Sequence, residues 1–193
     1  VIDSTYTNPI LTHGEYGQMG DPFVIRYNGM YYMYYSAPNA PCWTSSDLVN
    51  WTYAGTTMPD NGLGYGPWAP EVTYYNGKFY MYTSIDGNGH YVFESDSPTG
   101  PFLPVTDNIG LSIDGNVFID DDGKWYFSTA GVGGSGGMST AEKDGVGIYE
   151  MTSPTSVNLG SLVDSGIVSH GGGWTEGPML IKYRGNDFMT YLG

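Results

Sequence analysis

Hydrophobic and aromatic residues occur along this chain in short runs that are separated by tight-turn pairs. Residues 30–35 and 78–83 are apolar or aromatic on both faces, which is typical of strands packed between two neighbouring sheets. Asn28-Gly29, Asn76-Gly77 and Asp122-Gly123 predict short hairpin turns, because both residue types tolerate positive φ. No stretch has the spacing of an amphipathic helix over several turns. The pattern therefore predicts an all-β chain.

The strand-turn-strand pattern recurs at intervals of roughly 45 to 60 residues, a period expected of propeller blades. The turn glycines that anchor the four copies are Gly29, Gly77, Gly123 and Gly185. A third strand and a Ser-rich turn follow each of the first three copies. We predict one domain over residues 1–193, a partial β-propeller with about three and a half blades. The predicted blades span approximately 19–60, 66–108, 112–158 and 174–193, the last incomplete.

Closed propellers have about 4 to 8 blades, so the sequence predicts strand edges that need covering. We expect either a truncated chain or self-association through the open blade edges.

Composition narrows the range of partners. The formal net charge is −14, which opposes binding to nucleic acid or to an anionic membrane. No apolar run approaches the roughly 20 residues that a membrane span needs. The single Cys42 excludes an internal disulfide, and His13, His90 and His170 lack a mutual spacing typical of metal ligands. We predict no metal site from these residues.

Acidic residues stand ahead of the predicted inner strands. Asp21 lies eight residues before its turn glycine, and Asp114 and Glu176 each lie nine before theirs, whereas Glu71 lies six before. Equal height on the inner strands of a propeller means convergence on one end of the central channel. Three neighbouring carboxylates cannot all ionise freely, so one holds a proton near neutrality. A protonated acid beside an ionised carboxylate is what glycosidic bond cleavage requires. The alternative is that each acid only caps a turn.

Four segments resemble successive motifs of the five-bladed propellers of glycoside hydrolase family 43. They are Gly20-Asp21-Pro22, Trp68-Ala69-Pro70-Glu71-Val72, Ile113-Asp114-Gly115-Asn116-Val117-Phe118 and Thr175-Glu176-Gly177-Pro178. The resemblance implies an inverting hydrolase with Asp21 as general base, Asp114 as pKa modulator and Glu176 as general acid. We also predict substrate contacts for Trp68, Glu71, Trp174 and His170, although blade-to-blade packing is an alternative for Trp68.

The resemblance further implies cleavage of α-L-arabinofuranosyl or β-D-xylosyl linkages in plant polysaccharides or oligosaccharides. Many members hold calcium in the channel with a His from a later blade. This chain has no His at a matching position, so we predict no metal ligands and no required cofactor. The sequence starts at Val1 without the features of a signal peptide, and we expect a bacterial enzyme that is secreted. The alternatives are a catalytically inactive sugar-binding propeller and a purely structural propeller fragment.

Overall fold

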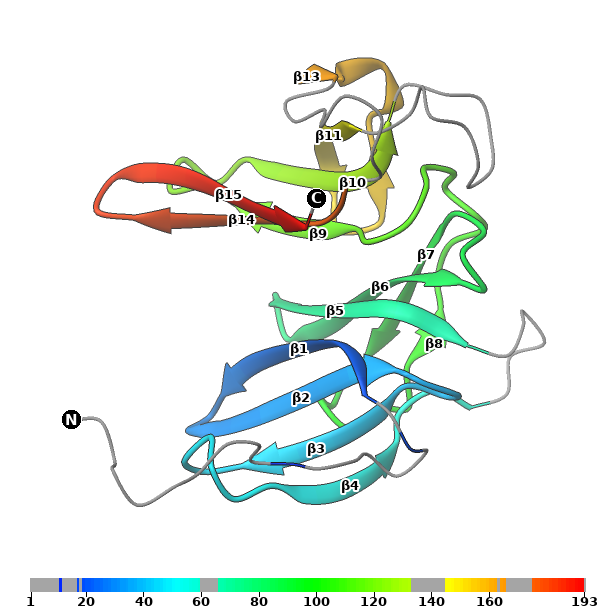
Figure 1. Cartoon of the computed structure of the whole chain (residues 1–193), viewed down its shortest axis with the longest axis vertical. Coiled ribbons are helices and arrows are strands. Elements are labelled where there is room, and N and C mark those ends of the chain that lie inside the picture. The colour runs from blue at the N-terminus through cyan, green and yellow to red at the C-terminus, as the bar shows by residue number, and fades with distance from the viewer. Residues whose placement is uncertain are drawn as a thin grey trace.

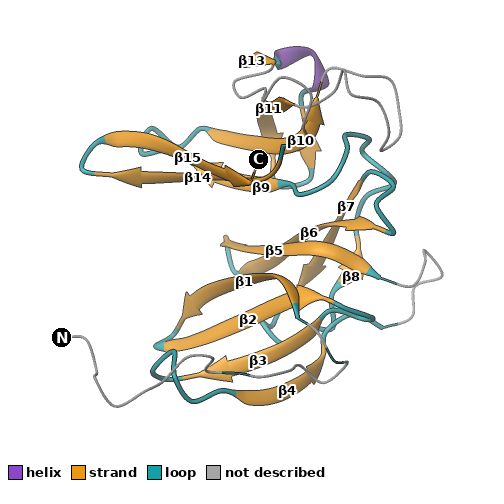
Figure 2. Ribbon diagram, in the orientation of Figure 1, coloured by secondary structure: helices purple, strands orange, loops and turns teal. Residues whose placement is uncertain are grey.

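The computed structural model describes residues 11, 17, 19–59, 66–132, 145–162, 164–165 and 175–192. These residues form four antiparallel sheets that follow one another along the chain (Figures 1 and 2). One 3₁₀ turn, Leu159–Ser161, is the only helical element that they contain. Within this described part, no helix is long and apolar enough to cross a membrane. The all-β prediction is confirmed.

Two of the sheets are four-stranded meanders, a third is five-stranded, and the last is a single hairpin. The first contains β1 (Gly20–Tyr27), β2 (Met30–Ser36), β3 (Pro41–Ser45) and β4 (Thr52–Thr56). The second contains β5 (Pro67–Tyr75), β6 (Lys78–Ile85), β7 (His90–Ser95) and β8 (Leu103–Pro104). The third contains β9 (Asn116–Ile119), β10 (Trp125–Val132), β11 (Gly145–Ser153) and β12 (Ser156–Val157), and β13 (Asp164–Ser165) pairs with β11. The hairpin is β14 (Glu176–Tyr183) with β15 (Asn186–Leu192).

The first strands of consecutive sheets lie next to one another. Strand β1 contacts β5, β5 contacts β9, and β9 contacts β14, so the sheets succeed each other as blades around a shared inner side (Figure 1). Propeller blades have this order, with the first strand innermost. The arrangement brings the starts of four inner strands together, although they are far apart in the sequence.

Three of the four inner hairpins have two-residue turns. Asn28-Gly29, Asn76-Gly77 and Arg184-Gly185 have positive φ at both positions, the conformation that matches the twist of the flanking strands. The hairpin predicted at Asp122-Gly123 also forms, between β9 and β10, but its turn is longer than two residues. Here Ile119 pairs with Trp125, which leaves a longer connection that hydrogen bonds within itself from Gly123 N to Asp120 O at 2.9 Å.

The core consists of side chains packed between neighbouring blades. Tyr34, Met81 and Phe93 are fully buried between the first and second blades, and Tyr82 and Phe127 between the second and third. Tyrosine suits this position because its ring fills the space while its hydroxyl finds a partner. Two tyrosines make the same contact one blade apart: the hydroxyl of Tyr34 donates to Pro98 O at 2.5 Å, and that of Tyr82 donates to Pro154 O at 2.7 Å.

Candidate active site

A cavity of about 240 Å³ lies where the starts of the four inner strands meet. Two of the predicted catalytic acids, Asp21 and Asp114, line it, and so does Glu71. Glu176 begins β14 and follows Thr175, directly before the lining residue Gly177. The full lining is Asp21, Pro22, Phe23, Ala69, Pro70, Glu71, Asp114, Gly115, Asn116, Gly177, Pro178 and Met179.

A repeated backbone irregularity forms the walls of this cavity. Each inner strand has one residue in the left-handed region at its start: Asp21 (φ 50°), Ala69 (φ 43°), Asp114 (φ 57°) and Gly177 (φ 61°). In β1, β5 and β14 the strand register shifts at this residue. A bulge of this kind re-aims a side chain. The positive φ costs a residue with a Cβ about 1–2 kcal/mol, so packing around the bulge must stabilise it.

The bulges show which acids occupy equivalent positions on their inner strands. The sequence placed Asp21, Asp114 and Glu176 at nearly one height, but the structure puts Asp21 and Asp114 at the shared bulge position and Glu176 one residue earlier on its strand. The difference arises because the turn after β9 is longer than the other turns, so counting back from its glycine shifts Asp114. The three acids nevertheless remain neighbours.

Asp21 is an exposed carboxylate with a fixed orientation. Ser36, at the end of β2, donates its hydroxyl to Asp21 Oδ2 at 2.5 Å. The same hydroxyl oxygen accepts a hydrogen bond from Ala69 N at 2.7 Å. One serine therefore connects the Asp21 bulge with the equivalent bulge of the next blade.

The ionisation of Asp114 is perturbed by its surroundings. Its pKa is raised to about 6, first by burial and then by the negative charges of Glu176 and Asp21. The N–H of Gly177, which donates to Asp114 Oδ2 at 3.0 Å, opposes this rise. Since the charges of both other acids reach Asp114, the three form one electrostatic group, as the sequence predicted from their positions.

Glu71 lies in the cavity wall and is only 6% exposed. Its carboxyl accepts from Asn116 Nδ2 at 2.8 Å and from Val117 N at 2.9 Å. Asn116 Oδ1 in turn accepts from Leu180 N on β14 at 2.8 Å. Burial raises the pKa of Glu71 to about 8 despite the two donors. The structure therefore uses both oxygens of Glu71 to join the second, third and fourth blades, and substrate contact by this residue stays a prediction.

Of the aromatic and histidine residues predicted to contact substrate, the structure describes only Trp68. Trp68 is 37% exposed, and its indole lies over Gly87, where a Cβ would come within 2.8 Å of Trp68 Cζ3. It does not belong to the cavity lining. His170 and Trp174 lie outside the described residues, so their roles stay predictions.

Sequence reasoning missed three residues that hold the acids in place: Ser36, His90 and Asn116. Asn116 was quoted within the Asp114 motif but given no role, and His90 was considered only as a metal ligand. Buried His90 accepts a hydrogen bond at Nε2 from Gly115 N, at 2.9 Å. The one usable signal was repetition, since Ser36 and Ser84 both close the second strand of a blade and pair with the residue before the bulge.

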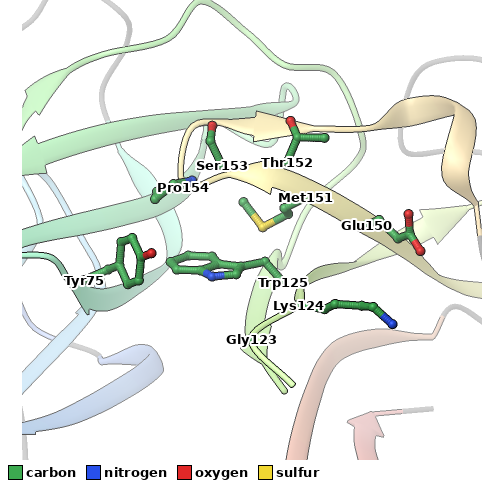
Figure 3. Close-up of a pocket in the computed structure, with 9 residues that line it drawn as sticks. All are labelled: Tyr75, Gly123, Lys124, Trp125, Glu150, Met151, Thr152, Ser153 and Pro154. Atoms are coloured by element: carbon green, nitrogen blue, oxygen red, sulfur yellow. The ribbon is translucent and has the colours of Figure 1, made fainter. Parts of the chain in front are cut away.

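A second, larger cavity of about 550 Å³ lies at the turn end of the second and third blades. Figure 3 shows its wall, with Tyr75 against the edge of Trp125, Met151 beside the indole, and Lys124 and Glu150 together at one end. Glu150 is the only carboxylate among its lining residues. Acid-base chemistry with two carboxylates is therefore supported in the smaller cavity and not here.

Among the residues that the structure describes, no three His, Cys, Asp or Glu side chains gather in a way that could hold a metal ion.

Comparison with known proteins places these features in a family. The family model for glycosyl hydrolases family 43 matches residues 6–192. A xylan 1,3-beta-xylosidase of a Vibrio species is 30% identical over 208 residues, which cover 94% of this chain and 36% of that protein. A non-reducing end alpha-L-arabinofuranosidase of Bacteroides ovatus is 28% identical, over 94% of this chain and 35% of its own length.

Solved structures agree in fold. A thermostable family-43 glycoside hydrolase superposes with a TM-score of 0.78 at 32% identity, covering 97% of this chain and 66% of that one. An alpha-L-arabinofuranosidase from Clostridium thermocellum gives a TM-score of 0.72 at 28% identity, covering 92% and 64%. The chain thus spans about a third of the length of these curated relatives and slightly less than two thirds of these structures, and the partial-propeller prediction is confirmed.

Proposed function

The chain belongs to glycosyl hydrolases family 43, and from this we propose that it hydrolyses glycosidic bonds with the carboxyl groups of Asp21, Asp114 and Glu176. The observation that carries the proposal is the electrostatic coupling of Asp114 to both other acids beside one cavity. Such coupling holds a proton on the group near neutral pH while a further carboxylate stays ionised. That is the requirement of acid-base glycosidic cleavage.

We assign the base role to Asp21. Its carboxylate is exposed, and Ser36 Oγ donates to one of its oxygens, which fixes its orientation. An ionised carboxylate with access to water can accept the proton of a water molecule that attacks the anomeric carbon. Inversion follows if that water attacks from the side opposite the leaving group, which needs carboxyl groups about 6.5–9.5 Å apart.

Glu176 is assigned as the general acid and Asp114 as the group that adjusts it. One oxygen of Asp114 is held by the N–H of Gly177, the residue that follows Glu176. This fixes the Asp114 charge next to Glu176. In this assignment Glu176 protonates the leaving oxygen.

We propose an α-L-arabinofuranosyl or β-D-xylosyl linkage of a plant oligosaccharide or polysaccharide as the substrate. The named relatives support this choice, since they include an alpha-L-arabinofuranosidase and a xylan 1,3-beta-xylosidase. A neutral sugar also suits a chain with a net charge of −14. We also propose that the protein is secreted by a bacterium into surroundings that contain such polymers.

Replacing Glu176 by glutamine tests the assignment. We expect hydrolysis of an arabinofuranosyl or xylosyl oligosaccharide, whose sugar leaving group needs protonation, to be lost while sugar binding, measured by calorimetry, is kept. Glu150→Gln in the second cavity is the matched control and should hydrolyse like the wild type. Hydrolysis that persists in Glu176→Gln contradicts the acid assignment, and binding without hydrolysis in the wild type supports the inactive sugar-binding alternative.

A further inference from the structure

His90 begins β7 in the second blade, yet its side chain reaches into the third. The imidazole is fully buried, and its Nε2 accepts a hydrogen bond from Gly115 N at 2.9 Å. Its ring meets Phe127 edge to face, with centroids 5.1 Å apart. The backbone of His90 is anchored on both sides, donating to Gly110 O at 3.0 Å and accepting from Ile109 N at 2.9 Å. The acceptor nitrogen is therefore held in a fixed place.

The protonation state of His90 follows from these contacts. Because Nε2 accepts a hydrogen bond, the proton of the neutral ring is on Nδ1. Burial lowers the pKa of His90 to about 4, so the ring stays neutral at ordinary pH. Nδ1 itself is buried with no hydrogen-bond partner among the described residues. The bond that Nε2 accepts from Gly115 N is therefore the well-formed hydrogen bond of this ring.

Gly115 is fitted to this acceptor. A Cβ on Gly115 would stand 2.2 Å from Phe127 Cζ and 2.7 Å from His90 Nε2, so a larger residue cannot occupy the position without displacing one of the two rings. Gly115 directly follows Asp114, whose φ of 57° is the strained conformation of the bulge. The bond from Gly115 N to His90 thus fixes the peptide that joins Asp114 to Gly115.

Fixing this peptide sets the direction of the Asp114 side chain. Asp114 Oδ2 accepts from Gly177 N on β14 at 3.0 Å, and the charges that face it are those of Glu176 on β14 and Asp21 on β1. The Asp114–Gly115 peptide and the Asp114 carboxyl share the Asp114 Cα, so a bond that holds the peptide also restricts the bulge that carries the carboxyl. In the described part of the chain, His90 is the side chain that accepts a hydrogen bond from Gly115 N.

We propose that His90 is a positioning residue, which fixes the Asp114–Gly115 peptide through Nε2 and thereby holds the Asp114 carboxyl against the Glu176–Gly177 peptide. The effect of this positioning on catalysis rests on the proposed function. The geometric claim itself concerns only the orientation of Asp114, and it can be tested without turnover.

The test compares His90→Gln, which can offer an acceptor oxygen, with His90→Phe and His90→Met, which cannot. The titration of the Asp114 carboxyl is followed by carbon-detected NMR on the full chain. We expect both acceptor-free variants to move the titration midpoint by about half a unit or more, and His90→Gln to stay closer to the wild type. Two acceptor-free variants are used so that failure of one to fold does not decide the result.

Kinetics on a nitrophenyl glycoside add a second readout. We expect kcat to fall about 10- to 100-fold in the acceptor-free variants, with a much smaller change in KM and partial rescue in His90→Gln. A folded acceptor-free variant with an unchanged Asp114 titration overturns the proposal. If neither acceptor-free variant folds, the proposal is overturned when His90→Gln folds but its Asp114 titration differs from that of the wild type. If the acceptor-free variants show an altered Asp114 titration but the wild type shows no turnover, the positioning role holds and the proposed function is contradicted.

Discussion

Replacing Glu71 by glutamine removes an acceptor from a buried contact that joins three blades. Both oxygens of Glu71 accept, from Asn116 Nδ2 at 2.8 Å and from Val117 N at 2.9 Å. Asn116 cannot turn over to compensate, because its Oδ1 already accepts from Leu180 N. The glutamine NH₂ group must therefore face one of the two donors.

The size of the effect follows from that single conflict. A buried donor that loses its acceptor costs about 1–3 kcal/mol. For a chain of this size each kcal/mol lowers the Tm by about 2–4 °C, so a loss of ~2 kcal/mol corresponds to a Tm lower by ~4–8 °C. Thermal unfolding followed by circular dichroism measures it, with Glu150→Gln on the surface as the control.

The same variant tests the ionisation of Glu71. Its pKa is about 8 in the folded chain, raised by burial, whereas a free Glu titrates near 4.3. The folded state therefore holds a proton that the unfolded state releases, and this contribution to stability is fully present below about pH 4 and is lost as the pH rises through 8. The difference in the free energy of unfolding between wild type and Glu71→Gln should narrow over that interval.

Two results would refute this reasoning. A Tm for Glu71→Gln within about 1 °C of the wild type would mean that the contact does not join the blades energetically. A difference between the two proteins that grows as the pH rises from 5 to 9 would mean that Glu71 is ionised in the folded chain at neutral pH.

Other predictions follow from neighbouring contacts. Burial lowers the pKa of His90 to about 4. The contribution of neutral His90 to stability is therefore present above about pH 6.5 and is lost as the pH falls through 4. Urea unfolding at pH 7 and 4.5 should show a fall in the free energy of unfolding at the lower pH that is larger in the wild type than in His90→Gln. Tyr82→Phe removes the hydrogen bond to Pro154 O and should lower the free energy of unfolding by about 0.5–1.5 kcal/mol. A Tyr126→Phe control, at a partly exposed position of β10, should lack this effect. Large apolar side chains such as Tyr183, Phe188 and Leu192 are exposed on β14 and β15, and we expect light scattering to show self-association at high concentration; a strictly monomeric chain with one cooperative unfolding transition would contradict it.

Much of the fold could be predicted from local signals. Asn-Gly pairs fix hairpin turns by their tolerance of positive φ, and their recurrence gives the blades. The hairpin at 120–124 was predicted but the length of its turn was not; in the structure Lys182 on β14 pairs with Asp120 and Asp121 of this turn. Such a contact between distant parts of the chain leaves no local pattern.

Two of the three proposed acids were predictable for the same reason as the turns, since Asp21 and Asp114 occupy equivalent places in a repeat. The residues that hold them were not. Ser36 orients Asp21 from the end of another strand, and His90 orients Asp114 from another blade. A lone serine or histidine in a strand has many ordinary uses, and only the three-dimensional structure shows which peptide it contacts.

The most direct test of the account is sugar release from nitrophenyl α-L-arabinofuranoside, β-D-xyloside and a galactoside by the wild type, Asp21→Ala and Asp107→Ala. Asp107 is exposed and lies outside the cavity lining, so its variant controls for loss of a surface charge. The account predicts release of arabinose or xylose by the wild type and Asp107→Ala, and a fall of about 10²- to 10⁴-fold in Asp21→Ala. Equal release by Asp21→Ala, or no release by the folded wild type, would contradict it.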